Sequence, residues 1–158
     1  YLADEIARRG IVVCTTIQAL VGKINYYNEN GCATSSEQKE YDILRTYEDT
    51  VLRAIELTRS YIKYTIGSDA GWRISPFGAI VTGMKMMCDT GMGNIEAIHA
   101  VTGRPSDFME ISDTVGYLKP GAQADFLILD EDPEENILAF AGKKRVFLKG
   151  KEVSIRVY

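Results

Sequence analysis

One carboxylate in this sequence has neighbours that suit it for chemistry. Asp69 follows a run rich in Tyr, Ile and Thr at residues 61–66 and lies between Gly67 and Gly71. Glycines on both sides allow a tight turn that leaves the carboxylate accessible. Such a group can bind a divalent metal ion or accept a proton from water. The alternative is structural, because an Asp here can also cap the turn before a following helix.

Three further residues are candidates for a site. Trp72 and Arg73 follow Asp69 on the same loop, where they could line a substrate pocket, Arg73 by pairing with a substrate carboxylate. A partly buried aromatic ring beside a solvated charge explains the same pair equally well. His99 is the only histidine and lies in a stretch rich in Ile and Ala that is predicted to be helical. A lone helical His favours a surface or packing role.

The elements around Asp69 predict a parallel sheet. Residues 11–17 are apolar and β-branched without alternation, which predicts a strand buried on both faces, with Cys14 in the core. Residues 61–66 predict a second strand. Between them, the polar stretch 18–36 predicts a long loop, and a helix follows to about Arg59. This order is a βαβ unit, and ligands gather at the carboxyl ends of parallel strands.

The remaining elements predict helices followed by a small β unit. A capping box of Thr34 with Glu37, or of Ser35 with Gln38, predicts the start of the helix that ends near Arg59. Further helices are predicted at 77–89, at 94–102 with Asn94 as cap, and as a short turn at 105–109. Strands are predicted at 124–129, 145–148 and 152–157, the last two joined by a hairpin turn at 149–151.

Composition narrows the classes of partner. The chain has 158 residues, 46% of them hydrophobic, and a formal net charge of -4, so it can form a packed core and does not suit nucleic acid or anionic membranes. Three widely spaced cysteines predict no disulfide framework and favour a reducing, cytoplasmic location. No apolar run reaches the length of about 18 residues that spans a bilayer. The opening residues read as the end of a helix, which predicts a fragment.

The segments around Asp69 and toward the C-terminus resemble a known family. Gly-Ser-Asp-Ala-Gly at 67–71 resembles the G-[ST]-D-A-G motif on the eighth barrel strand of the amidohydrolase superfamily. Residues 95–105 are similar to its E-A-L-x-x-A-T-x-x-P-A segment. Residues 115–130 resemble its signature G-x-L-x-P-G-x-x-A-D-[LF]-[VI]-[VIL]-L-D. The resemblance covers nearly the whole chain and is strongest to prolidase-like and imidazolonepropionase-like members.

This resemblance implies a fold, a reaction and a metal. The fold class is α/β: residues 1–112 would be the last strands and helices of a (β/α)8 TIM-like barrel, and 113–158 the C-terminal part of a composite β-sandwich. The reaction would be metal-dependent hydrolysis of a carbon–nitrogen bond in a dipeptide or cyclic amide. Asp69 would be a metal ligand and the general base for the hydrolytic water. The divalent metal, zinc or a similar ion, would be held mostly by residues outside this chain.

The sequence also departs from the family pattern at the expected metal ligands. Relatives carry a His-x-His pair, a carboxylated Lys or Glu and two further His, none of which can be placed here; after the Asp motif, this chain reads Pro76-Phe77-Gly78 where many relatives have a His. A catalytic metal needs about three protein ligands, so the chain by itself is expected to be inactive. The rest of the barrel, or a homo-oligomer, is its expected partner. The alternative function is a non-catalytic binding or scaffolding module.

Overall fold

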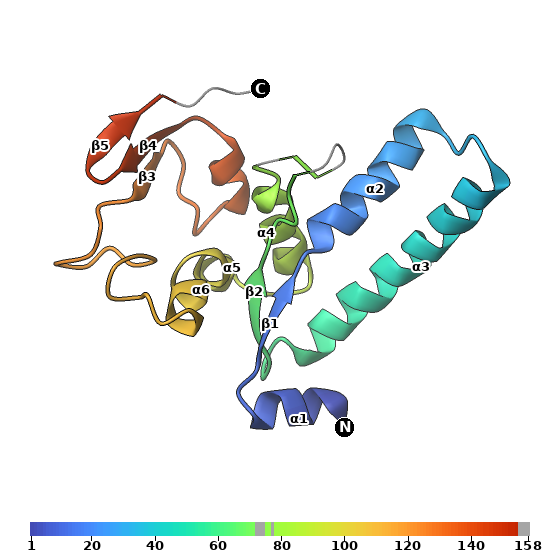
Figure 1. Cartoon of the computed structure of the whole chain (residues 1–158), viewed down its shortest axis with the longest axis horizontal. Coiled ribbons are helices and arrows are strands. Elements are labelled where there is room, and N and C mark those ends of the chain that lie inside the picture. Colours follow the sequence, from blue (N-terminus) through green and yellow to red (C-terminus); the bar gives the residue numbers. More distant parts are fainter. Residues whose placement is uncertain (72–74, 77, 155–158) are drawn as a thin grey trace. The chain divides into compact units, whose positions relative to one another are not determined.

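The chain folds into two compact units. The computed structural model describes residues 1–71, 75–76 and 78–154. Tyr1–Met92 form the first unit, and the second begins at Gly93. Each unit contains helices and strands of its own (Figure 1).

A parallel pair of strands lies at the centre of the first unit. The pair is built from β1 (Val12–Thr15) and β2 (Lys63–Ile66), with Val12 opposite Lys63 and Thr15 opposite Ile66. The helices of this unit are α1 (Leu2–Arg8), α2 (Ile17–Asn30), α3 (Ser35–Thr58) and α4 (Ile80–Asp89). The predicted βαβ unit with a parallel pair is therefore confirmed.

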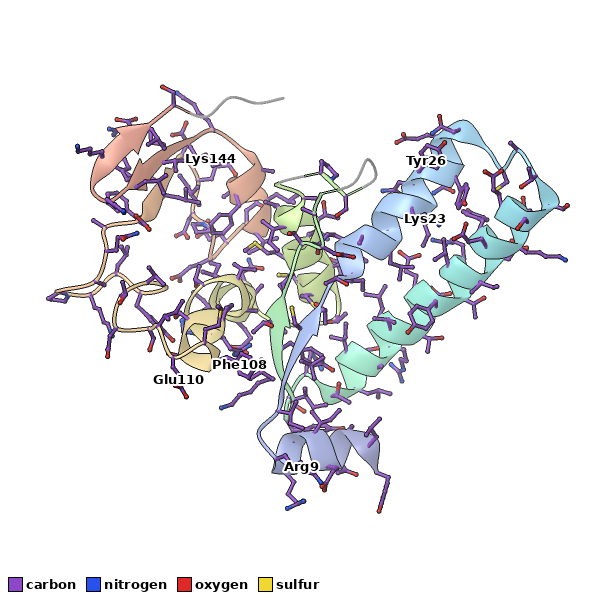
Figure 2. The ribbon with its side chains drawn as sticks, viewed as in Figure 1. Arg9, Lys23, Tyr26, Phe108, Glu110 and Lys144 are labelled. Atoms are coloured by element: carbon purple, nitrogen blue, oxygen red, sulfur yellow. The ribbon has the colours of Figure 1, made fainter. Side chains whose placement is uncertain are left out.

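The connection between the two strands is a long helical hairpin of α2 and α3 (Figure 1). Thr34 begins α3 through a capping box: its hydroxyl accepts from the Glu37 amide at 3.2 Å, and the Glu37 carboxylate accepts from the Thr34 amide at 2.9 Å. Such a cap stabilises a helix by about 1 kcal/mol. Lys23, labelled on α2 in Figure 2, pairs with Glu40 on α3.

The predicted loop at 18–36 is wrong, because most of it is α2. The apolar side chains of Ile17, Ile24 and Tyr27 recur at helical spacing and are buried, at 3%, 2% and 7% exposed. This stripe packs α2 against the rest of the unit and outweighs the low helix propensity of the asparagines that follow. The helix ends at Gly31, whose φ of 72° suits glycine best.

The first strand is less buried than its composition predicts. Val12, Val13 and Thr15 are half-buried and Cys14 is exposed, so the predicted burial on both faces and the core position of Cys14 are wrong for this chain. The physical reason is the size of the sheet. Among the described residues β1 pairs only with β2, whereas a strand buried on both faces needs covering layers on each side.

Methionines fill much of the core beside the strands. Met87, Met84 and Met92 are 0%, 1% and 6% exposed, and Met86 is half-buried. Thioether side chains adapt to irregular gaps, which suits the methionines to this packing role.

The second unit places three helical segments beside an antiparallel sheet. The helices are α5 (Asn94–Val101), α6 (Gly103–Phe108) and the 3-10 turn η1 (Ile137–Ala141). The strands β3 (Phe126–Leu129), β4 (Lys144–Leu148) and β5 (Lys151–Val153) pair in the order β3-β4-β5. Gly93, not the predicted Asn94, caps α5; the Asn94 amide instead donates to the Glu134 carbonyl at 2.8 Å.

The hairpin of this sheet explains an aspartate in the C-terminal signature segment. Lys149 and Gly150 join β4 to β5 with φ of 51° and 75°, the paired positive values of a type I′ turn. The Asp125 carboxylate accepts from the Lys149 amide at 2.7 Å, and the Gly150 amide donates to the Ala124 carbonyl at 2.8 Å. Asp125 therefore fixes the start of β3 to the hairpin turn, which is a structural function.

The predicted fold class, α/β and part of a larger barrel and sandwich, agrees with this architecture. Across residues 1–71, 75–76 and 78–154, no helix combines the length and the apolar character needed to span a membrane.

Candidate functional site

The candidate site is the turn that follows β2. Asp69 is exposed there, between a half-buried Ser68 and a half-buried Ala70. Its φ of 45° lies in the left-handed region, which few residues other than glycine adopt and which Asp and Asn tolerate best. The turn lies at the carboxyl end of a parallel strand pair, the edge of the sheet where α/β proteins bind ligands.

Two buried side chains hold the backbone that leads into Asp69. The Gln18 amide donates to the Gly67 carbonyl at 2.6 Å, and the Ser75 hydroxyl donates to the Ser68 carbonyl at 2.9 Å. Gln18 is 3% exposed and Ser75 is fully buried. Both peptide carbonyls immediately before Asp69 are therefore fixed by donors from outside the turn.

Gln18 has little freedom to move. It is the second residue of α2, so it follows β1 just as the turn follows β2. Its side chain lies against Gly83 of α4, where an added Cβ would come within 2.3 Å of the Gln18 Oε1. The Gly67 carbonyl can only accept, so the Gln18 amide nitrogen must face it. This requirement sets the orientation of the Gln18 amide. Gln18 Oε1 is buried and has no hydrogen-bond partner among the described residues.

Gly67 lets the two strand ends approach closely. Its amide donates to the Thr15 carbonyl at 2.8 Å, continuing the parallel pairing past the end of β2. A Cβ at this position would lie 2.9 Å from the Cys14 Sγ. A larger residue would therefore crowd the Cys14 side chain at the start of the turn.

The described residues do not form a metal site by themselves. Within residues 1–71, 75–76 and 78–154, no group of three or more His, Cys, Asp and Glu side chains could hold a metal ion. Asp69 supplies one carboxylate, whereas a catalytic metal needs about three protein ligands. The arrangement can present an accessible carboxylate that binds a cation together with other donors or accepts a proton.

The sequence also predicts Trp72, Arg73 and His99 as candidates. Trp72 and Arg73 lie outside the described residues. His99 is exposed on α5, in the second unit, and its ring makes an edge contact with the Tyr117 ring at 6.3 Å between centroids. This is a packing environment, as the single helical histidine predicts.

The second unit has an apolar pocket of about 670 Å³ between α5, α6 and β3. Ile98, Val101, Met109 and Phe126 are among the side chains that line it. Its one carboxylate, Asp125, has a lowered pKa because it accepts hydrogen bonds from the Lys149 amide and the Gln123 side chain. The Asp125 carboxylate thus has a structural role, and the surface that the described residues present to the pocket is mainly apolar.

Gln18 lies beside the candidate site but is not among the site residues that the sequence predicts. It lies in the stretch predicted to be a loop, and a glutamine is not a typical catalytic group. One signal was present: a polar residue directly follows an apolar strand, in the same relation to residues 11–17 as the Asp69 motif to 61–66. Parallel strands place both positions at one edge of the sheet.

Comparison with known proteins identifies the family. The sequence profile described as "Amidohydrolase family" matches residues 5–153. The chain therefore belongs to the amidohydrolase family, whose members are hydrolases that generally use divalent metals. The resemblance seen in the motifs is confirmed. No match was found among curated protein sequences.

Solved structures share the fold. A Xaa-Pro dipeptidase with bound methionine is 18% identical with a TM-score of 0.80, over 96% of this chain and 36% of its own. A prolidase in complex with N-methylphosphonate-L-proline is 21% identical with a TM-score of 0.79, over 98% and 37%. Molinate hydrolase is 20% identical with a TM-score of 0.66, over 96% and 34%. The chain thus spans about a third of the length of these proteins.

Proposed function

We propose that this chain is the C-terminal part of a metal-dependent amidohydrolase that hydrolyses carbon–nitrogen bonds. Membership of the amidohydrolase family supports this proposal. Dipeptides of the prolidase type are the first substrate class, because a Xaa-Pro dipeptidase and a prolidase are among the structures that share the fold. Cyclic amides are the second, on the resemblance to imidazolonepropionase-like sequences.

Asp69 is the catalytic residue of this proposal. The observation that carries it is the exposed carboxylate at the carboxyl end of β2, with both preceding carbonyls held by buried donors. Because the backbone before it is held, the Asp69 carboxylate can be presented to the attacking water and accept its proton.

The metal, zinc or a similar divalent ion, belongs to the proposal for the whole enzyme. Asp69 provides one donor, and the remaining ligands lie outside the described residues. The isolated chain is therefore proposed to be inactive, and the rest of the barrel is its necessary partner. Trp72 and Arg73 remain proposed substrate contacts, since they follow Asp69 on the same loop.

A substrate panel on the full-length protein tests this function. With saturating zinc or manganese, hydrolysis of Xaa-Pro dipeptides, other dipeptides and cyclic amides is compared by release of the new amine or carboxylate. We expect turnover of at least one class and none after removal of the metal with a chelator. Turnover that persists without metal would contradict the metal dependence. Binding of these compounds without hydrolysis would instead favour the non-catalytic binding or scaffolding module.

A further inference from the structure

We propose that Gln18 is a positioning residue for Asp69, acting with Ser75; the two side chains are named the carbonyl clamp. The inference rests on the proposed function of Asp69. The clamp holds the carbonyls of Gly67 and Ser68, the two peptide groups immediately before the catalytic residue. Fixing both planes restricts the backbone that gives Asp69 its left-handed conformation at φ 45°.

The position of Gln18 favours this role over simple packing. Among the described residues its side chain makes one hydrogen bond, to Gly67, and its oxygen makes none. A buried amide whose oxygen has no partner among the described residues adds little to the stability of a core. Its polar function is therefore concentrated on the turn that carries Asp69.

Gly83 adapts α4 to the clamp. A Cβ there would come within 2.3 Å of Gln18 Oε1 and 2.9 Å of the Ile66 Cγ2. The glycine leaves the space in which the Gln18 amide can lie flat against the helix and still reach Gly67. Three elements, α2, β2 and α4, thus meet at this one side chain.

A double-mutant cycle in the full-length enzyme tests the proposal. Kinetics are measured with the panel's best substrate for the wild type, Gln18→Leu, Asp69→Asn and the double variant. We expect Gln18→Leu to lower kcat on the order of 100-fold, as misplacement of a catalytic group by about 1 Å does, with KM within a few-fold. In the Asp69→Asn background the same change should cost less than about twofold, because residues that act as a unit are not additive.

Further variants separate the hydrogen bond that Gln18 donates from the packing of its side chain. Gln18→Glu keeps the size of the side chain and loses the donor, so it should lower kcat as Gln18→Leu does; Gly83→Ala should do so by displacing the amide. Gln38→Leu is the matched control, because Gln38 is exposed on α3 and bonds only Asp42 among the described residues. It should leave kcat unchanged. If Gln18→Leu does not fold, Ser75→Ala takes its place in the cycle.

A crystal structure of the full-length Gln18→Glu variant provides a readout that needs no activity. We expect Asp69 to leave the left-handed region. An unmoved turn, a normal kcat in Gln18→Leu, or an equal loss in both backgrounds would overturn the clamp. Failure of the proposed function is recognised separately, because Asp69→Asn would then keep normal turnover whatever the Gln18 variants do.

Discussion

At the scale of single residues, conformation and exposure separate two aspartates of the family motifs, Asp69 and Asp125. Asp69 is exposed at φ 45° with its preceding carbonyls held, whereas Asp125 accepts hydrogen bonds from a backbone amide and a glutamine. Both belong to segments that resemble the same family. The carboxylate of Asp69 is therefore accessible, whereas that of Asp125 has a structural role.

His99 is expected to be dispensable for catalysis. His99 is exposed on α5. Among the described residues, the one aromatic ring that its imidazole contacts is that of Tyr117. We expect His99→Gln in the full-length enzyme to leave kcat within a few-fold of wild type. Steady-state kinetics provide the measurement. A loss on the order of a thousand-fold, equivalent to about 4 kcal/mol of transition-state stabilisation, would place His99 in the reaction.

At the scale of elements, the α2–α3 hairpin carries its own pH dependence. The Tyr27 hydroxyl donates to the Glu40 carboxylate at 2.6 Å, and this bond raises the pKa of Tyr27 from 10.0 to about 12. The hydrogen bonds from Lys23 and then Tyr27 lower the pKa of Glu40. A raised pKa means that the folded state holds the Tyr27 proton more tightly than the unfolded state does.

The linkage between proton binding and folding sets the direction in which each group changes stability with pH. The contribution of Tyr27 is fully present below pH 10 and is lost as the pH rises toward about 12. The contribution of Glu40 is present above its ordinary pKa of 4.5 and is lost as the pH falls through the lowered value. We expect Tyr27→Phe in the full-length protein to show a shallower loss of thermal stability between pH 10 and 12. Identical slopes for wild type and variant would refute this.

The elements also show what sequence could and could not predict. The strands at 11–17 and 61–66, the capping box at Thr34 and the parallel pairing follow from local pattern. The helix α2 was missed because Asn28, Asn30 and Gly31 obscured an apolar stripe whose burial depends on α3 and α4. The flanking glycines mark Asp69. The role proposed for Gln18 depends on a contact with a residue 49 positions away, and its place directly after the apolar run 11–17 does not reveal that contact.

At the scale of the whole molecule, the free edges of the β1–β2 pair predict association. The described residues pair these strands only with each other, and unpaired strand edges promote intermolecular pairing. We expect the isolated 158-residue chain to self-associate or aggregate in sedimentation experiments. A stable monomer on dilution would count against a barrel that needs further strands, unless other segments rearrange to cover the edges.

The isolated chain should also lack tight zinc binding. The described residues offer no group of three potential ligands, and one carboxylate cannot hold zinc at micromolar concentration against water. Calorimetric titration of the chain and of its Asp69→Ala variant is expected to give no stoichiometric binding in either. Micromolar binding that the variant abolishes would show that this chain contains a site of its own.

Asp69 is proposed as the catalytic group that this chain contributes to a larger hydrolase, and the kcat of full-length Asp69→Asn at saturating metal measures that role. Asn keeps the size and tolerates the left-handed turn, so thermal stability should stay near wild type. It cannot accept the proton of the attacking water, so we predict a loss of about 100- to 10,000-fold in kcat. An unchanged kcat would contradict the claim.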